Sequence, residues 1–424
     1  MMIQTWLEKL SSGEWDNTLE LLYADVPAAR QRALHVVRRW QEVFARDDEA
    51  EIMLVSAPGR TELGGNHTDH QHGCVLCGGV DLDAMACVGV NGLKQIRVCS
   101  EEYGMAETDL SCLDPQTEEV GTSAALIRGV AAGFAQRGYP VAGFDAYVVS
   151  AVPAGSGLSS SAAYEVLLGT AMNALTGAEL DPVTLAKIGQ KAENIWFGKP
   201  CGLLDQTACA VGAVSAVDFA DPENPVVEAV EVDFAAHGYA LCIVDTRSDH
   251  ADLTDAYAAI PAEMKAVAAC FEKEVLREVD EREFLARLAE VRRQTGDRAV
   301  LRAMHFFEEN RRAKEQAAAL KQGDFEGYLR LVRESGRSSQ CLLQNIFAGD
   351  PSHQAVALSL ARGEQLLSGR GAIRVHGGGF AGTVQAYVPL EMLEEFRGGM
   401  EALLGEGACH VVRIRPCGGY VISK

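Results

Sequence analysis

A run of glycines and serines near the middle of the sequence is the strongest candidate for chemistry. It follows an apolar segment at residues 146–151 and precedes a helix-forming segment at residues 162–175. Glycine lets the backbone approach an anion closely, and the first N–H groups of a helix lack partners within the helix. The run is therefore predicted to bind phosphate. Its residues are Gly155, Ser156, Gly157, Leu158, Ser159, Ser160 and Ser161.

Three consecutive serines exceed what a helix cap needs, so one hydroxyl is available to reach a metal ion. An ordinary P-loop is excluded, because no Gly-Lys-Ser/Thr closes the run. The alternative interpretation is a strand-to-helix turn with a serine cap and no ligand. Taken alone, the run indicates binding of an anion and does not specify a reaction.

A second polar cluster follows an earlier apolar run. The apolar run at residues 52–56 ends at Ala57-Pro58-Gly59-Arg60, and polar residues fill positions 66–73 before apolar character returns at Val75. This pattern predicts a strand, a functional loop and a second strand.

Three histidines and two cysteines in this region raise the question of a bound transition metal. A polar loop that faces a small ligand explains the histidines without a metal, and no second Cys-Xaa-Xaa-Cys pair follows the one present. We therefore predict no zinc site. The residues are His67, His70, His72, Cys74 and Cys77.

The glycine-serine run lies within Pro153 through Ala162, which resembles the nucleotide-binding motif of the GHMP kinases. Within that superfamily, other segments resemble galactokinase motifs in the family's order. The resemblance extends from about residue 50 to the end of the chain. The segments are the galactose signature at residues 59–70, a Glu-Ala-Glu-Asn-like segment at 191–194, a Cys-Gly-Ile-Met-Asp-Gln-like segment at 201–206 and a glycine-rich segment at 376–382.

The resemblance implies a role for each matching residue. Asp205 is expected to face the anomeric hydroxyl of the sugar as catalytic base, with Arg60 stabilising charge near the γ-phosphoryl group. Ser161 and Glu193 are expected to hold Mg²⁺, which prefers hard oxygen ligands. The residues expected to contact the sugar are Asn66, His67, Asp69, Gly202 and Tyr257. The nucleotide is expected to contact residues 155–161 together with Gly378 and Gly379.

Asn66 is the most consequential departure from the family's pattern. Galactokinases usually have glutamate there, in contact with the hydroxyl at carbon six; asparagine is shorter and neutral, although it still accepts hydrogen bonds. Glu62, Gly64 and His70 also replace the usual asparagine, isoleucine and tyrosine. The family's Ser-Cys-Pro-Glu-Leu-Asp segment is missing, and residues 341–345 stand near its place. A kinase for an N-acetylated or C6-altered hexose therefore remains an alternative.

Residue periodicity predicts the elements that must position these side chains. Asn91-Gly92 between two alternating segments is typical of a hairpin, because both residues tolerate positive φ. Helices are predicted at about residues 1–45, 123–137, 162–175, 181–196 and 253–321. Strands are predicted at 52–56, 86–90, 96–99, 146–151, 211–219, 384–388 and 411–414.

Bulk properties narrow the class of protein. A chain of 424 residues favours two domains, and a net charge of −21 disfavours nucleic-acid or membrane partners. Twelve cysteines without a secretory signal indicate a reduced, cytoplasmic protein, and no apolar stretch approaches the ~20 residues of a membrane span. Both a monomer and a homodimer are compatible with the sequence.

Together these observations predict an α+β, two-domain GHMP kinase fold, with a domain like ribosomal protein S5 domain 2 followed by a ferredoxin-like domain. The domains are expected at residues 46–220 and 221–424, after a helical extension at 1–45, with the active site between them. The predicted activity is galactokinase, with MgATP as phosphate donor. A second alternative is a non-catalytic protein that senses sugar and ATP.

Overall fold

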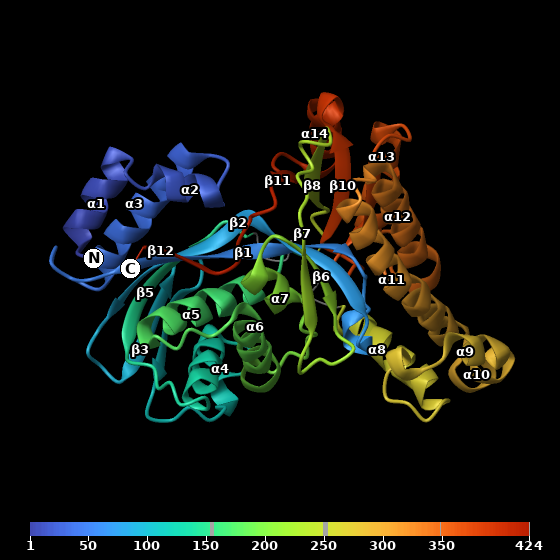
Figure 1. The fold of residues 1–424 in the computed structure, drawn as a ribbon, viewed down its shortest axis with the longest axis horizontal. Helices are drawn as coiled ribbons and strands as arrows, with labels where there is room; N and C mark the ends of the chain where they lie inside the picture. Colours follow the sequence, from blue (N-terminus) through green and yellow to red (C-terminus); the bar gives the residue numbers. More distant parts are fainter. Residues whose placement is uncertain (153–156, 249–252, 348, 424) are drawn as a thin grey trace.

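The computed structural model describes residues 1–152, 157–248, 253–347 and 349–423. Two sheets with helices on their faces form an elongated molecule, with α1 to α3 at one end and α9 and α10 at the other (Figure 1).

The larger sheet has eight strands within the described residues. Its main order is β12-β1-β2-β5-β3-β4, and β6 pairs with both β2 and β7. The strands are β1 (Met53–Gly64), β2 (Cys74–Val90), β3 (Gln95–Ser100), β4 (Gly104–Asp109), β5 (Phe144–Ser150), β6 (Val214–Asp218), β7 (Val226–Val230) and β12 (Tyr420–Ser423).

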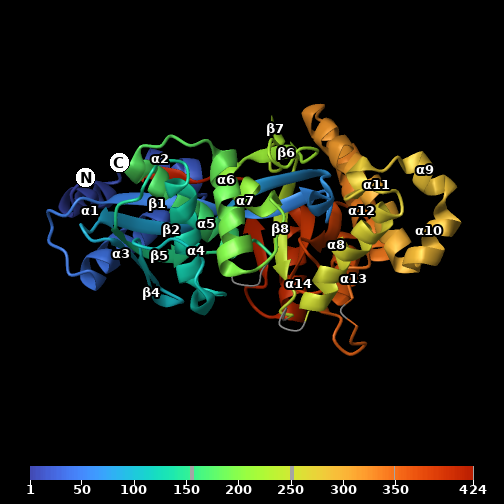
Figure 2. The same ribbon diagram turned by 90° about the horizontal axis from the view of Figure 1, so that it is seen from below.

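Helices cover both faces of this sheet, as the two ribbon views show (Figure 2). Successive strand residues point to opposite faces. Accordingly, Val55 and Val148 pack with α4 to α6, whereas Leu54 and Tyr147 pack with α1 to α3. The N-terminal helices thus bury a face that the sheet would otherwise expose. The helices are α1 (Ile3–Ser12), α2 (Asp16–Leu22), α3 (Val26–Val43), α4 (Ser123–Ala135), α5 (Ser160–Thr176), α6 (Pro182–Lys191) and α7 (Leu204–Val211), with a π-helical turn at Ala192–Phe197.

The smaller sheet has the order β11-β8-β10-β9 and packs helices on both faces. Ala372 and Tyr387 contact α12, whereas Ile373 and Val384 lie in the cluster that includes α13 and α14. Its strands are β8 (Tyr239–Asp245), β9 (Ala372–His376), β10 (Thr383–Pro389) and β11 (Cys409–Val412). The helices are α8 (Thr254–Ala269), α9 (Glu281–Ala286), α10 (Leu288–Thr295), α11 (Asp297–Lys321), α12 (Phe325–Ser338), α13 (Ala355–Leu367) and α14 (Leu393–Leu404), with a π-helical turn at Ser339–Leu343.

The hairpin predicted at Asn91-Gly92 is wrong. The chain does turn there, with φ of 73° at Gly92, but β5 lies between β2 and β3 and pairs with both. The buried Asp145 of β5 accepts hydrogen bonds from Asn91 Nδ2 at 2.8 Å and from two nitrogens of Arg97 at 2.7 Å. These bonds stabilise β5 between β2 and β3. Because β5 lies some 50 residues after the Asn91-Gly92 turn, the residue pattern around the turn does not indicate that a strand is inserted there.

Two expected boundaries also differ from the structure. The first strand continues through Arg60 to Gly64, so Arg60 lies on a buried strand and not in a loop. The boundary expected at residue 220 falls between β6 and β7, which pair with each other, and β12 returns from the C-terminus to pair with β1. The larger sheet therefore includes residues from both sides of the expected boundary.

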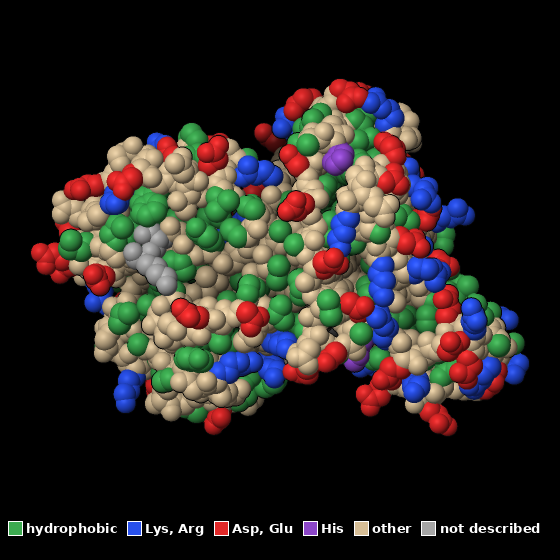
Figure 3. All heavy atoms as spheres, in the orientation of Figure 1, with side chains coloured by type: hydrophobic (Ala, Val, Ile, Leu, Met, Phe, Trp, Pro, Cys, Tyr) green, Lys and Arg blue, Asp and Glu red, His purple; other side chains and the backbone are tan. Residues whose placement is uncertain are grey.

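Acidic and basic side chains are interspersed over the face shown in Figure 3. All twelve cysteines are unpaired in the structure. In the part of the chain that the structure describes, no helix combines the length and the apolar character needed to cross a membrane.

Candidate active site

Arg60 and Asp205 meet where β1 passes the start of α7. Arg60 Nε donates a hydrogen bond to Asp205 Oδ1 at 2.7 Å, and Arg60 Nη1 donates to the carbonyl oxygen of Gly157. The Arg60 side chain is 7% exposed and the Asp205 side chain 30%. The pair therefore keeps one open side, on the carboxylate.

Hydrogen bonds and charge keep the carboxylate of Asp205 ionised. Burial alone would raise its pKa, but the charge of Arg60 and the hydrogen bonds from Arg60 and Ser159 outweigh burial and lower the pKa below its usual value. Ser159 Oγ donates to Asp205 Oδ2 at 2.6 Å. Both carboxylate oxygens thus accept hydrogen bonds from groups of fixed position.

The described part of the phosphate loop leads directly into α5. Gly155 and Ser156 lie outside the described residues. Gly157 and Ser159 have φ of 66° and 57°, so the chain turns sharply before Ser160 begins the helix. Ser159 occupies the N-cap position but makes no side-chain cap, because its hydroxyl donates to Asp205. The structure therefore contradicts the alternative of a simple serine cap, and the first N–H groups of α5 are not capped by that side chain.

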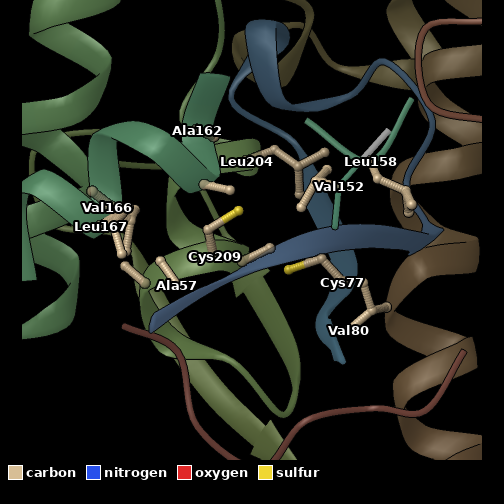
Figure 4. Packing of buried hydrophobic residues seen from close by; sticks show 14 of the residues in the cluster. Ala57, Cys77, Val80, Val152, Leu158, Ala162, Val166, Leu167, Leu204 and Cys209 are labelled. Atoms are coloured by element: carbon tan, nitrogen blue, oxygen red, sulfur yellow. The ribbon is translucent and has the colours of Figure 1, made fainter. Parts of the chain in front are cut away.

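Apolar packing positions the two site elements against the larger sheet. Leu158 of the loop and Ala162 of α5 belong to the same buried cluster as Leu204 and Cys209 of α7, beside β1 and β2 (Figure 4). The backbone N–H of Arg60 donates to the carbonyl oxygen of Leu158 at 3.0 Å. Loop, strand and helix are thus held together beneath the charged groups.

Ser161 and Glu193, the predicted metal ligands, lie side by side. Ser161 Oγ donates to Glu193 Oε1 at 3.1 Å, and Lys199 Nζ lies 3.3 Å from the same oxygen. Two hard oxygens together, already attracting one cation, fit Mg²⁺. Among the described residues no group of three or more His, Cys, Asp or Glu side chains could hold a metal, so phosphate oxygens and water would supply the remaining ligands.

Asp69 and Gly202 are in contact, although 133 residues separate them. A Cβ atom at position 202 would overlap the Asp69 carboxylate. Burial, followed by the negative charge of Asp205, raises the pKa of Asp69 to about 6, against backbone hydrogen bonds from His70 and Leu204 that lower it. Asp69 therefore titrates near the physiological range.

Asn66 and His67 lie under the glycine-rich segment. His67 Nε2 donates to the carbonyl oxygen of Gly378 at 2.9 Å, and burial lowers the pKa of His67. Asn66 is completely buried, and its side chain hydrogen-bonds to Glu62, Gly377, Ser339 and Asn345. The structure thus brings both residues to the site region but leaves Asn66 no exposed surface.

The glycine-rich segment packs closely against α8. Tyr257 Oη donates to the carbonyl oxygen of Gly379 at 2.6 Å, and a Cβ atom at Gly378 would lie 2.6 Å from the Tyr257 ring. Within the glycine-rich segment, Gly377 approaches the described part of the phosphate loop: a Cβ atom there would lie 3.7 Å from Arg60 Nη2 and 3.7 Å from the carbonyl oxygen of Gly157. The sequence alone selected Gly378 and Gly379, the next two residues.

Sequence reasoning missed Gln206, which joins two carboxyl groups. Gln206 Nε2 donates to Glu193 Oε2 at 2.8 Å and to Glu165 Oε2 at 3.0 Å. Burial, followed by the charge of Glu193, raises the pKa of Glu165 well above its usual value. The only sequence signal was that Gln206 follows Asp205 within the matched segment.

Known proteins resemble both the sequence and the fold. The model for the galactokinase galactose-binding signature matches residues 38–90, and the model for the GHMP kinases N-terminal domain matches residues 125–213. A galactokinase of Streptomyces coelicolor is 30% identical over 352 residues, which cover 82% of this chain and 87% of that protein.

Two solved structures illustrate the structural match. The galactokinase of Lactococcus lactis, crystallised with galactose, has a TM-score of 0.77 at 25% identity, over 90% of this chain and 98% of that chain. The mevalonate kinase of Methanococcus jannaschii has a TM-score of 0.58 at 15% identity, over 86% and 98% respectively. The expected two-domain GHMP kinase fold is confirmed.

The Arg60–Asp205 pair predicts a measurable energetic coupling. Arg60→Met leaves the carboxylate of Asp205 without its cation and is expected to cost about 2 kcal/mol of unfolding free energy. Asp205→Asn should cost less in the Arg60→Met background than in the unmodified chain. Urea denaturation at pH 7 measures the four-variant cycle. The exposed pair Arg292–Asp297 is the control and should show no coupling; additive effects at the buried pair would contradict the prediction.

Proposed function

The chain belongs to the galactokinase family of the GHMP kinases, and we propose that it transfers the γ-phosphoryl group of MgATP to the anomeric hydroxyl of D-galactose. The products are galactose 1-phosphate and ADP. The observation that carries this proposal is the convergence of Arg60, Asp205 and Ser159 at the start of α5, which the Ser159 side chain does not cap.

The acceptor hydroxyl is assigned to the open side of Asp205. An ionised carboxylate within hydrogen-bond reach can orient a hydroxyl and accept its proton. The hydrogen bonds from Arg60 and Ser159 keep that carboxylate in one orientation. Arg60 also presents a permanent positive charge where negative charge develops during phosphoryl transfer.

The phosphates are assigned to the start of α5, where backbone N–H groups favour anions. Ser161 and Glu193 would hold Mg²⁺. When bound, the ion supplies a positive charge that neutralises the phosphate oxygens. Lys199, now paired with Glu193, provides a second positive charge beside the phosphates.

Asp69 is assigned to sugar hydroxyls, because a carboxylate with two oxygens can accept from neighbouring hydroxyl groups. Its contact with Gly202 joins it to the segment that carries Asp205. His67 and Tyr257 border the same region through the glycine-rich segment.

The unpaired cysteines further support a reducing, cytoplasmic location.

The first test of function is turnover. Asp205→Ala removes the group that orients the hydroxyl, and kcat for ADP release with MgATP and galactose should fall about 10³-fold. Glu42→Ala removes an exposed carboxylate of α3, on the opposite face of the larger sheet from α5, and as the control should leave kcat unchanged. A panel of monosaccharides extends the assay. Turnover of no sugar would favour the non-catalytic sensor, whereas turnover that does not depend on Asp205 would contradict the role assigned to that residue.

Gly202→Ala tests the contact with Asp69. Because the added methyl group overlaps the carboxylate, Asp69 must move, and galactose affinity should fall about tenfold or more. Isothermal titration calorimetry measures the affinity. Gly169→Ala adds the same methyl group in ordinary contact with Leu185 and should bind galactose as the unmodified protein does. Equal affinity for galactose in both variants would remove Asp69 from the sugar site.

The raised pKa of Asp69 predicts a pH dependence. Above about pH 6 the carboxylate is ionised and accepts hydrogen bonds, whereas below it the bound proton removes an acceptor. Galactose affinity should therefore weaken about tenfold for each pH unit below the pKa. Calorimetric titrations between pH 5 and 7 measure this slope. Asp69→Asn should bind weakly without the slope; a slope that persists in that variant would assign it to another group.

A further inference from the structure

Asn66 has no hydrogen-bonding capacity left for a ligand. Its Nδ2 donates to the carbonyl oxygen of Gly377 at 2.6 Å and to the Glu62 carboxylate at 3.0 and 3.3 Å. Its Oδ1 accepts from Asn345 Nδ2 at 2.9 Å and from Ser339 Oγ at 3.2 Å. Two N–H groups and two lone pairs are all that an amide side chain offers, and none of its surface is exposed.

The partners determine which way round the amide lies. A main-chain carbonyl oxygen can only accept, so the amide nitrogen of Asn66 must face Gly377, and the Glu62 carboxyl group lies on the same side. Asn345 Nδ2 also donates to the carbonyl oxygen of Gly378 at 3.1 Å, which agrees with its role as donor to Asn66. The orientation follows from the network on both sides.

Main-chain bonds and an ion pair extend this network across the two sheets. The carbonyl oxygen of Asn66 accepts from His305 Nε2 at 2.9 Å. Glu62 of β1 pairs with Arg374 of β9 at 2.6 Å, and both side chains are almost completely buried. Asn66 thus lies between the larger sheet, α11, the π-helical turn after α12 and the glycine-rich segment.

We propose that Asn66 is a positioning residue that does not contact the sugar. With Glu62, Arg374, Ser339 and Asn345 it forms the Asn66 network, which holds the carbonyl oxygens of Gly377 and Gly378 beside the site. The carboxylate of this network belongs to Glu62, which pairs with Arg374 and does not face the ligand. The sugar-facing acceptors are then Asp69 and Asp205. The inference deepens the proposed function and rests on it for the identity of the ligand.

The test removes the hydrogen bond from Asn66 to Glu62 and then restores it with donor and acceptor exchanged. Asn66→Asp removes the donor to Gly377 and places a second carboxylate beside Glu62 in a buried setting, so kcat/KM for galactose should fall about 30-fold. Adding Glu62→Gln supplies an amide that can donate to the new carboxylate. The double variant should recover about tenfold of the loss. Asn224→Asp is the matched control, because Asn224 makes the same bond to Asp221 at an exposed turn.

A sugar series distinguishes positioning from contact. Galactose and its 2-, 3-, 4- and 6-deoxy forms are assayed with the unmodified protein and with Asn66→Asp. A positioning residue lowers kcat/KM for all these sugars alike, so each galactose-to-deoxy ratio should change less than about threefold. A ratio that collapses for one deoxy sugar would show that Asn66 contacts the missing hydroxyl and would overturn the proposal. Absence of recovery in the double variant would also overturn it.

Failure of the proposed function can be told apart from failure of this inference. If the unmodified protein turns over no galactose, the same variants are compared by thermal unfolding. Asn66→Asp should then lower the midpoint by about 2 °C or more, Glu62→Gln should restore part of it, and Asn224→Asp should leave it unchanged. Equal midpoints for Asn66→Asp and the unmodified protein would overturn the inference by itself.

Discussion

The ion pair between Arg60 and Asp205 constrains most of the site around it. A buried guanidinium is tolerated only when its charge and its N–H groups are satisfied, so β1 must pass within reach of both the α7 carboxylate and the Gly157 carbonyl oxygen. Ser159 donates a hydrogen bond to the same carboxylate, so its side chain does not cap α5. One electrostatic requirement therefore positions the strand, the loop and two helix N-termini together.

The same strand also joins the two sheets. Immediately after Arg60, the side chain of Thr61 and the main chain of Glu62 accept hydrogen bonds from Gln385 of β10. The N–H of Glu62 donates to His376 Nε2 at 3.2 Å, and burial lowers the pKa of His376 well below its usual value. A neutral His376 can accept there and donate from Nδ1 to Thr383. The seam between the sheets is thus polar, and these hydrogen bonds link the glycine-rich segment to the strand that carries Arg60.

A chain with a net charge of −21 repels phosphate as a whole, so any phosphate site must depend on local groups. Among the residues that the structure describes, such groups are the start of α5, which Ser159 does not cap, the guanidinium of Arg60 and the ammonium of Lys199. Nearby negative charge is either paired, as at Asp205, or made costly, as at Asp69 and Glu165, where burial raises the pKa. The balance of local charge at the phosphate end therefore differs from that of the whole chain.

The sequence by itself determined the identity of the groups. The phosphate loop, Arg60, Ser161, Glu193 and Asp205 stand in short segments whose residue types serve a chemical task, and such segments can be recognised without knowing the fold. The elements that carry them follow from periodicity, since α5 and β5 begin and end within a few residues of the prediction.

Only the tertiary structure decided what depends on contacts between distant residues. β5 lies between β2 and β3, and β12 returns to the larger sheet. The side chain of Asn66 accepts hydrogen bonds from Ser339 and Asn345, more than 270 residues away. Local spacing cannot encode such contacts, because pairing between strands and satisfaction of a buried amide depend on which groups arrive from elsewhere in the chain. Asn66 therefore belongs to a recognisable sugar signature in the sequence, while its hydrogen bonds are set by the folded protein.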